Sequence, residues 1–165
     1  MDIIWLWGRP CSGKTTIAKE LNDYYISKGK RVLLLDGDIT RSSNKNNDFT
    51  PSGRWKQIKY VQNKLIYDTE HDIAIVALIT PYYDMRTNNR DILHNYYEVF
   101  INVPIVVANK RDVKGMYQKA REGKIKNFTG ISDVFDKKNI SDIICYTKDE
   151  DVKVSVNKII TKRKQ

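Results

Sequence analysis

Short apolar runs alternate along this chain with longer segments in which apolar residues recur every three or four positions. The short runs have the length of strands buried on both faces, and the longer segments have the period of amphipathic helices. The predicted strands are Asp2–Trp7, Arg31–Asp36, Asp72–Leu78, Tyr97–Asn102 and Asp142–Tyr146. The predicted helices are Lys14–Lys28, Arg54–Thr69, Met85–Asn95, Val106–Asn109, Gly115–Arg121 and Asp149–Lys162.

This alternation predicts an α/β fold, with a mostly parallel five-stranded sheet and helices on both faces. The chain has 165 residues, no internal repeat and no Pro/Gly-rich linker, so we expect one domain over 1–165. Ligands bind beyond the carboxyl ends of the strands in such sheets. Functional residues are therefore expected just after each predicted strand.

A phosphate-binding loop follows the first predicted strand, because Gly8 to Thr15 match the pattern G-x-x-x-x-G-K-[ST]. The glycines let successive backbone N–H groups point at a phosphate. Lys14 supplies charge for the β- and γ-phosphates, and the Thr15 hydroxyl can ligate Mg²⁺. Strand, loop and helix come in the order that a P-loop NTPase fold requires. The predicted nucleotide contacts in this loop are Gly8, Arg9, Pro10, Cys11, Ser12, Gly13, Lys14, Thr15 and Thr16.

Polar side chains also follow the second and third predicted strands. Asp36 and Asp38 flank a glycine, and such carboxylates can hold a Mg²⁺ shell or accept a proton from an attacking hydroxyl. Arg41 can hold a phosphate, and Thr80 ends the third strand. The alternative is a surface turn with solvated charges, but the phosphate-binding loop favours a functional role.

A basic, glycine-containing segment over about 111–135 predicts a lid above the phosphates, since closure would exclude water. The alternative is a basic surface helix and loop. Asn109–Asp112, just before it, has the N-K-x-D pattern by which small GTPases recognise guanine. However, no D-x-x-G follows the third predicted strand, where a GTPase has its γ-phosphate switch. A GTPase-like nucleotide switch is therefore a remote alternative.

Composition narrows the classes of function. The net charge is +9, but basic residues are spread along the chain and flank the phosphate motifs, so we expect no nucleic-acid partner. An enzyme with polyanionic substrates also gains from a positive field. No apolar run approaches the length of a membrane span, and no signal peptide is evident. Two widely separated cysteines, Cys11 and Cys145, favour a reduced, cytoplasmic protein.

Taken together, these segments resemble the adenylylsulfate (APS) kinases, a P-loop family. The similarity covers nearly the whole chain and keeps both order and spacing. The resemblance implies a kinase that transfers the γ-phosphate of Mg-ATP to the 3′-hydroxyl of a nucleoside 5′-phosphosulfate. Members often dimerise, so it is also compatible with a homodimer. The segments that carry it are Gly8–Thr16, Leu35–Arg41, Phe49–Arg54, Ile79–Arg86, Arg111–Tyr117 and Lys126–Ile131.

Roles follow from this resemblance by position. Phe49 and Phe128 resemble the two aromatics that sandwich the acceptor base, and Arg111 and Lys114 resemble lid contacts to nucleotide. The expected catalytic residues are Lys14, Asp36 and Asp38, with Asp36 acting on the 3′-hydroxyl and Asp38 supporting the metal shell. The expected metal ligands are Thr15 and Asp36. The expected acceptor-binding residues are Asp38, Arg41, Phe49, Arg54, Gln57, Ile79, Thr80, Pro81, Lys114 and Phe128.

The acceptor helix departs from the family pattern, which reads roughly Asp-Arg-x-Glu-Asn-Ile-Arg-Arg. Here Gly53–Tyr60 keeps only the first Arg, as Arg54, and the Ile, as Ile58. Losing polar groups from a pocket that hydrogen-bonds its substrate alters selectivity strongly. The chain thus looks similar to the APS-kinase-related cytidine diphosphoramidate kinases of bacterial capsule phosphoramidate synthesis. We expect cytidine diphosphoramidate as the acceptor, with adenylyl sulfate as the alternative.

Overall fold

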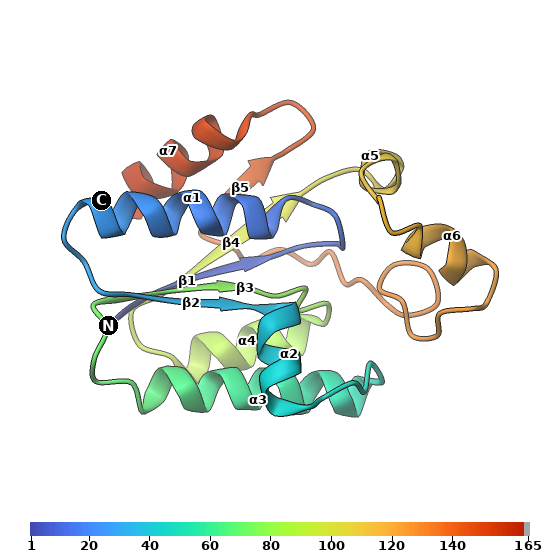
Figure 1. Ribbon diagram of the computed structural model, residues 1–165, viewed down its shortest axis with the longest axis horizontal. Coiled ribbons are helices and arrows are strands. Elements are labelled where there is room, and N and C mark those ends of the chain that lie inside the picture. The colour runs from blue at the N-terminus through green and yellow to red at the C-terminus, as the bar shows by residue number, and fades with distance from the viewer. Residues whose placement is uncertain (164–165) are drawn as a thin grey trace.

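The computed structural model describes residues 1–163 of this chain, and the predicted domain extends two residues beyond them. Its centre is a five-stranded sheet in the order β2-β3-β1-β4-β5, in which each neighbouring pair is parallel (Figure 1). Each predicted strand end lies within one residue of the observed one, because these apolar runs are continuous. The strands are β1 (Asp2–Trp7), β2 (Val32–Asp36), β3 (Ile73–Ala77), β4 (Tyr96–Asn102) and β5 (Ile143–Tyr146).

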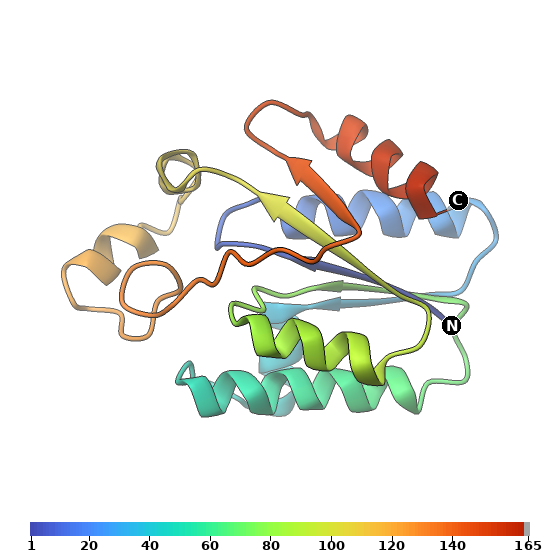
Figure 2. The same ribbon diagram turned by 180° about the vertical axis from the view of Figure 1, so that it is seen from behind.

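Helices cover both faces of the sheet, as the alternating pattern predicts (Figures 1 and 2). On one face, α1 (Lys14–Ser27) and α7 (Val152–Arg163) pack over Ile4 and Leu6 of β1. On the other face, α3 (Pro51–Ile66) and α4 (Tyr83–Ile92) pack against Trp5 and the strands beside it. Side chains of β1 alternate between the two cores because successive strand residues point to opposite faces.

One helix has no counterpart in the predicted elements. Helix α2 (Gly37–Asn44) follows β2 directly, and Thr40 is its only buried residue. Asp36 caps it, since one carboxylate oxygen accepts the Asp38 N–H at 3.0 Å. A polar helix held by its cap lacks the apolar stripe that reveals a helix in sequence. Asp36 and Asp38 therefore sit on a helix N-terminus rather than in a turn.

The segment between β4 and β5 projects beyond the carboxyl ends of the strands (Figure 1). It contains α5 (Ile105–Lys110) and α6 (Met116–Arg121), with a small core of its own that includes Tyr117 and Phe128. This places the predicted lid over the functional edge of the sheet. Within residues 1–163, no helix is long and apolar enough to cross a bilayer.

Candidate active site

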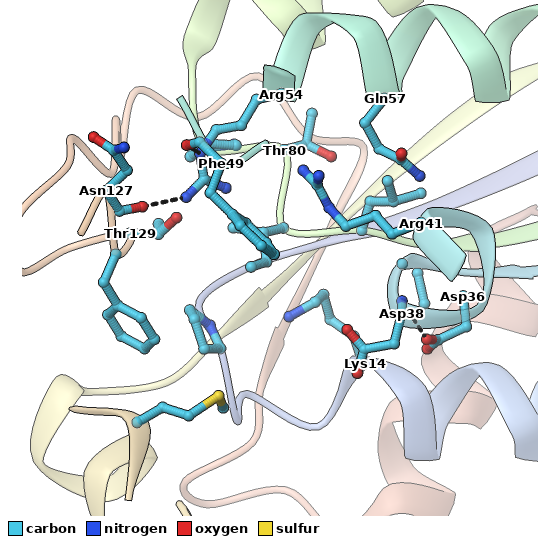
Figure 3. Close-up of a pocket in the computed structure, with 18 of the residues that line it drawn as sticks. Lys14, Asp36, Asp38, Arg41, Phe49, Arg54, Gln57, Thr80, Asn127 and Thr129 are labelled. Atoms are coloured by element: carbon cyan, nitrogen blue, oxygen red, sulfur yellow. Dashed lines mark hydrogen bonds between the residues drawn. The ribbon is translucent and has the colours of Figure 1, made fainter. Parts of the chain in front are cut away.

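A cavity of about 410 Å³ opens at the carboxyl ends of the strands. Figure 3 shows Lys14, Asp36 and Asp38 gathered on one side of it, with Phe49, Arg54 and Asn127 on the other. Segments distant in sequence meet here. Among its lining residues are Lys14, Thr15, Asp36, Asp38, Arg41, Phe49, Arg54, Gln57, Ile79, Thr80, Pro81, Lys114 and Phe128. Each residue predicted to contact the acceptor therefore borders one cavity.

The phosphate-binding loop is closely packed. Gly13 has a φ of 100°, and a Cβ at Gly8 would lie 2.4 Å from the Ile101 carbonyl oxygen, so neither position suits a side chain. The Lys14 ammonium donates to the carbonyl oxygens of Gly8 at 3.1 Å and Arg9 at 2.7 Å. Burial lowers the pKa of Lys14 to about 8. A phosphate in this loop would meet a cation already desolvated and oriented.

The Thr15 hydroxyl and the Asp36 carboxylate lie side by side. Thr15 donates to Asp36 Oδ2 at 2.7 Å, while Asp36 Oδ1 serves as the helix cap. One hydroxyl and one carboxylate suit Mg²⁺, which keeps waters and shares its remaining contacts with substrate phosphates. Within residues 1–163 no cluster of three or more His, Cys, Asp or Glu could form a cage. The donor set fits a metal carried in with a nucleotide.

Asp38 differs from Asp36 although only Gly37 separates them. Its side chain is exposed and lines the main cavity, near Lys14 and Asp36 (Figure 3). Both Asp36 oxygens already accept hydrogen bonds, whereas the Asp38 carboxylate faces open space. Of the two carboxylates, Asp38 is therefore the one left accessible to a molecule in the cavity.

Two aromatic side chains border the acceptor side. Phe49 is 46% exposed, and the Arg41 guanidinium lies 4.3 Å above its ring. Phe128 is buried and packs edge-on against Tyr117, with ring centroids 4.9 Å apart. The exposed ring and the anchored ring come from segments far apart in the sequence and border one cavity, which an aromatic sandwich requires.

Arg54 joins the acceptor loop to the lid. Its Nε lies 3.1 Å from Asp133 Oδ2, and its Nη2 donates to the Asn127 carbonyl at 2.7 Å. Tyr82 donates to the same Asp133 oxygen at 2.6 Å, and burial with this bond raises the pKa of Tyr82 to about 12. The sequence analysis missed Asp133 and Tyr82. Asp133 is one of three acids within the basic lid segment, so no sequence signal singled it out.

Gln57 borders the cavity, but its side-chain hydrogen bonds serve the fold. It donates to the Thr40 hydroxyl at 2.8 Å and accepts from the Asn44 amide at 2.9 Å. These bonds hold α2 against α3. A direct contact from Gln57 to the acceptor remains a prediction.

Gly53 marks a change in local packing. A Cβ there would lie 2.3 Å from both Cγ and the carbonyl oxygen of Asp48. Asn46 also donates to the Gly53 carbonyl at 2.9 Å, so the 46–48 loop rests on the first turn of α3. The family's acid at this position would not fit beneath that loop.

Thr80 is strained at the edge of the cavity. Its φ is 46°, which is unusual for a β-branched residue. The Trp5 indole donates to its hydroxyl at 2.9 Å, and Arg86 donates to its carbonyl at 3.1 Å. These two buried partners hold the end of β3 in a conformation that directs the following chain around the cavity.

Two arginines that are predicted to contact the nucleotide do not line the main cavity. Arg111 lines a neighbouring cavity of about 560 Å³ together with the start of α1 and the loop after β5. It donates to the Thr147 hydroxyl at 3.2 Å, and Thr147 donates to the Ser12 carbonyl. The Arg9 side chain lines neither cavity and stacks on Phe135 instead, so a nucleotide contact from this residue would come from its backbone and remains a prediction.

The N-K-x-D pattern is explained by the lid. Its residues end α5 rather than following a strand. Asp112 accepts the Tyr117 N–H at 2.7 Å, and Asn109 accepts from Arg121 at 3.2 Å. These side chains organise α5 and α6, so the sequence match carries no guanine site.

The model of the adenylylsulphate kinase family matches residues 2–146. The chain belongs to this family. It is 38% identical over 164 residues to the adenylyl-sulfate kinase of Microcystis aeruginosa, covering 96% of this chain and 89% of the relative. It is 40% identical over 160 residues to that of Rippkaea orientalis, covering 94% and 87%.

A solved structure agrees with this membership. The Mycobacterium tuberculosis APS kinase CysC in complex with AMPPNP and APS superimposes with a TM-score of 0.92 at 26% identity, covering 99% of this chain and 98% of that one. The predicted fold and enzyme class are thereby confirmed. The protein is a P-loop kinase with a hydroxyl acceptor, and its cofactors are ATP and Mg²⁺.

Proposed function

We propose that this chain transfers the γ-phosphate of Mg-ATP to the ribose 3′-hydroxyl of a nucleoside 5′-anhydride. One observation carries the proposal: a single cavity joins Lys14 and two carboxylates to two aromatic rings and two arginines. The first group suits a triphosphate and an attacking hydroxyl. The second group suits a base and an anionic 5′ end.

On the donor side, Lys14 and the backbone of the loop would hold the β- and γ-phosphates, and Thr15 and Asp36 would hold the metal. Bound Mg²⁺ neutralises charge that develops on the transferred group. We assign the proton acceptor to Asp38 rather than Asp36, because both Asp36 oxygens are engaged. Most of the acceleration comes from positioning and charge neutralisation.

On the acceptor side, Phe49 and Phe128 hold the base, and stacking alone tolerates any base. Arg41 faces the 5′ anhydride. Arg54 fixes the relation between the acceptor loop and the lid through Asp133 and Asn127. A homodimer remains a prediction.

Sequence similarity supports adenylyl sulfate as the acceptor, since the two relatives described above are named adenylyl-sulfate kinases. In this case the protein makes 3′-phosphoadenylyl sulfate. Arg41 would then serve the phosphosulfate, and Gln57 and Lys59 would stand where relatives have Asn and Arg.

The altered acceptor helix favours a second candidate, cytidine diphosphoramidate. Gly53 replaces the family acid under a loop that leaves no room for a side chain, and the Gln57 amide is engaged by α2. A pocket that has lost hydrogen-bonding groups discriminates against the substrate that used them. A smaller pyrimidine, whose terminal phosphoryl group carries an NH₂ in place of one oxygen, is compatible with such a loss.

The deciding experiment measures ADP release from Mg-ATP with adenylyl sulfate, cytidine diphosphoramidate, CDP or no acceptor, and locates the new phosphate by ³¹P NMR. A 3′-phosphorylated cytidine product with poor use of adenylyl sulfate would establish the second candidate. Efficient use of adenylyl sulfate would establish the first. ADP release that is independent of any acceptor would overturn the proposed function.

A further inference from the structure

The Arg9 side chain has no role in the site described above. It turns away from the phosphates, is 9% exposed, and lies with its Cζ 4.4 Å from the Phe135 ring centroid. Gly130 makes room for it, because a Cβ there would lie 2.2 Å from Arg9 Nη1. The Arg9 guanidinium is thus a buried cation enclosed by Phe135 and Gly130.

Among residues 1–163 this cation has no anionic partner. Stacking on Phe135 uses the face of the guanidinium, whereas its N–H donors point outward in the plane. Nη1 is buried without a hydrogen-bond partner among residues 1–163. Desolvation lowers the pKa of Arg9, which reflects the cost of burying its charge unpaired. An arginine in this state has unused capacity for two parallel hydrogen bonds to an oxyanion.

The surroundings supply the remaining groups. Arg9 lines a third cavity, of about 360 Å³, with Asn102, Lys137, Lys148 and Asp149. Three cations face one carboxylate, and both lysines are exposed at the rim. The guanidinium can bind an anion directly, and the lysines can attract it as mobile charges.

We propose that this cavity is a second oxyanion site, which takes free phosphate or sulfate separately from the nucleotide. The site adjoins the phosphate-binding loop through one residue. The Arg9 carbonyl accepts from the Lys14 ammonium at 2.7 Å, so an anion that holds the Arg9 side chain also holds a partner of Lys14. Its occupancy would therefore change the affinity for ATP.

The test measures binding of inorganic phosphate and, separately, of sulfate by isothermal titration calorimetry. The protein is saturated with Mg-AMPPNP so that the phosphate-binding loop is blocked, and the titration is repeated in Lys14→Ala, which weakens that loop's own anion site. We expect one saturable site per chain in both backgrounds. The tighter of the two anions is the one that the site prefers.

Variants assign the site. Arg9→Met should lower the affinity for the anion at least tenfold. The double variant Lys137→Ala with Lys148→Ala should lower it about threefold to tenfold, as expected for lost charge-assisted contacts. Lys153→Ala, an exposed lysine at the start of α7 away from this cavity, should leave it unchanged. No saturable binding in either background would overturn the proposal. So would binding that survives Arg9→Met and the double lysine variant.

Discussion

The donor half and the acceptor half of the active site are built differently. In the donor half, contacts are local, since Lys14 bonds to carbonyls five and six residues earlier in the same loop. In the acceptor half, Arg54 bonds to Asn127, which is 73 residues away in sequence. A local motif is complete once its segment folds, whereas the acceptor pocket exists only when α3, β3 and the lid are in place.

This difference separates two kinds of specificity. The loop that holds phosphates uses backbone and one lysine, so it is suited to any nucleoside triphosphate. The acceptor pocket uses side chains from several elements, each replaceable without unfolding the loop. Substitutions on the donor side should therefore abolish chemistry, and substitutions on the acceptor side should redirect it.

The largest effect is expected from Lys14→Ala. Turnover should fall by about 10³-fold, because a charge positioned on the β- and γ-phosphates is removed. The fold should persist, since a buried cation is lost rather than an apolar contact. ADP formation and circular dichroism measure the two outcomes. Lys19→Ala, on the exposed face of α1, is the matched control. Near-normal turnover would contradict the loop assignment.

The next effect separates the two carboxylates. Asp38→Asn should lower kcat by about 10²-fold, as expected when a general base is removed, with the KM for ATP unchanged. Asp36→Asn should instead raise the Mg²⁺ concentration needed for half-maximal rate. Measuring kcat against Mg²⁺ distinguishes them. If extra Mg²⁺ rescues Asp38→Asn but not Asp36→Asn, the assignment of base and metal ligand is reversed.

Phe49→Ala should spare the donor half. Loss of one stacking face should raise the acceptor KM by about tenfold and leave the Kd for AMPPNP unchanged. Since Phe49 is 46% exposed, the fold should tolerate this change. Ile39→Ala, at an exposed position on α2, serves as the control. If Phe49→Ala weakened AMPPNP binding as much as acceptor binding, the donor and acceptor halves would not be separable.

The smallest effect is a pH dependence of the donor half. Because the folded pKa of Lys14 is about 8, its charge is lost as pH rises through that value, and nucleotide affinity should fall by at most about tenfold per pH unit above it. Bound phosphate raises this pKa, and the affinity falls over the interval between the free and the bound pKa values. Titrating AMPPNP between pH 7 and about 9.5 measures it. Lys14→Arg should flatten the curve because its charge persists.

The same group predicts the opposite trend in stability. The unfolded chain keeps the lysine proton up to about 10.5, so the unfolded state binds more protons between pH 8 and 10. The Lys14 contribution to the free energy of unfolding therefore rises over that interval. The difference in urea denaturation between the wild type and Lys14→Met isolates it. A difference that is constant from pH 7 to about 10 would contradict the lowered pKa.

The sequence predicted most of the fold because its strands are continuous apolar runs. Helix α2 was missed because its stability comes from the Asp36 cap and from Gln57 rather than from an apolar stripe. Helix α3 begins three residues before the predicted start, at Pro51. Thr50 as a cap followed by Pro at the first helical position is a signal that was available.

The site was predictable where chemistry is local. The phosphate-binding loop follows from its pattern, and the resemblance placed the acceptor residues at one cavity. The pairing of Arg54 with Asp133 and Tyr82 could not be read from sequence, because it depends on how the lid returns to the end of β3. Likewise, no sequence pattern shows that the Arg9 side chain points away from the phosphate-binding loop to which its backbone belongs.

The close packing at Gly53 also sets the order in which substitutions in this pocket can be made. Restoring an acid at this position in a single step would force a Cβ to within 2.3 Å of Asp48, including its backbone oxygen. The 46–48 loop must first change, and only then does the acid become tolerable. The substitutions that would convert this pocket to that of its adenylyl-sulfate relatives are therefore tolerated in one order only, with the loop changed first. Directed evolution toward the relatives' specificity should begin in that loop.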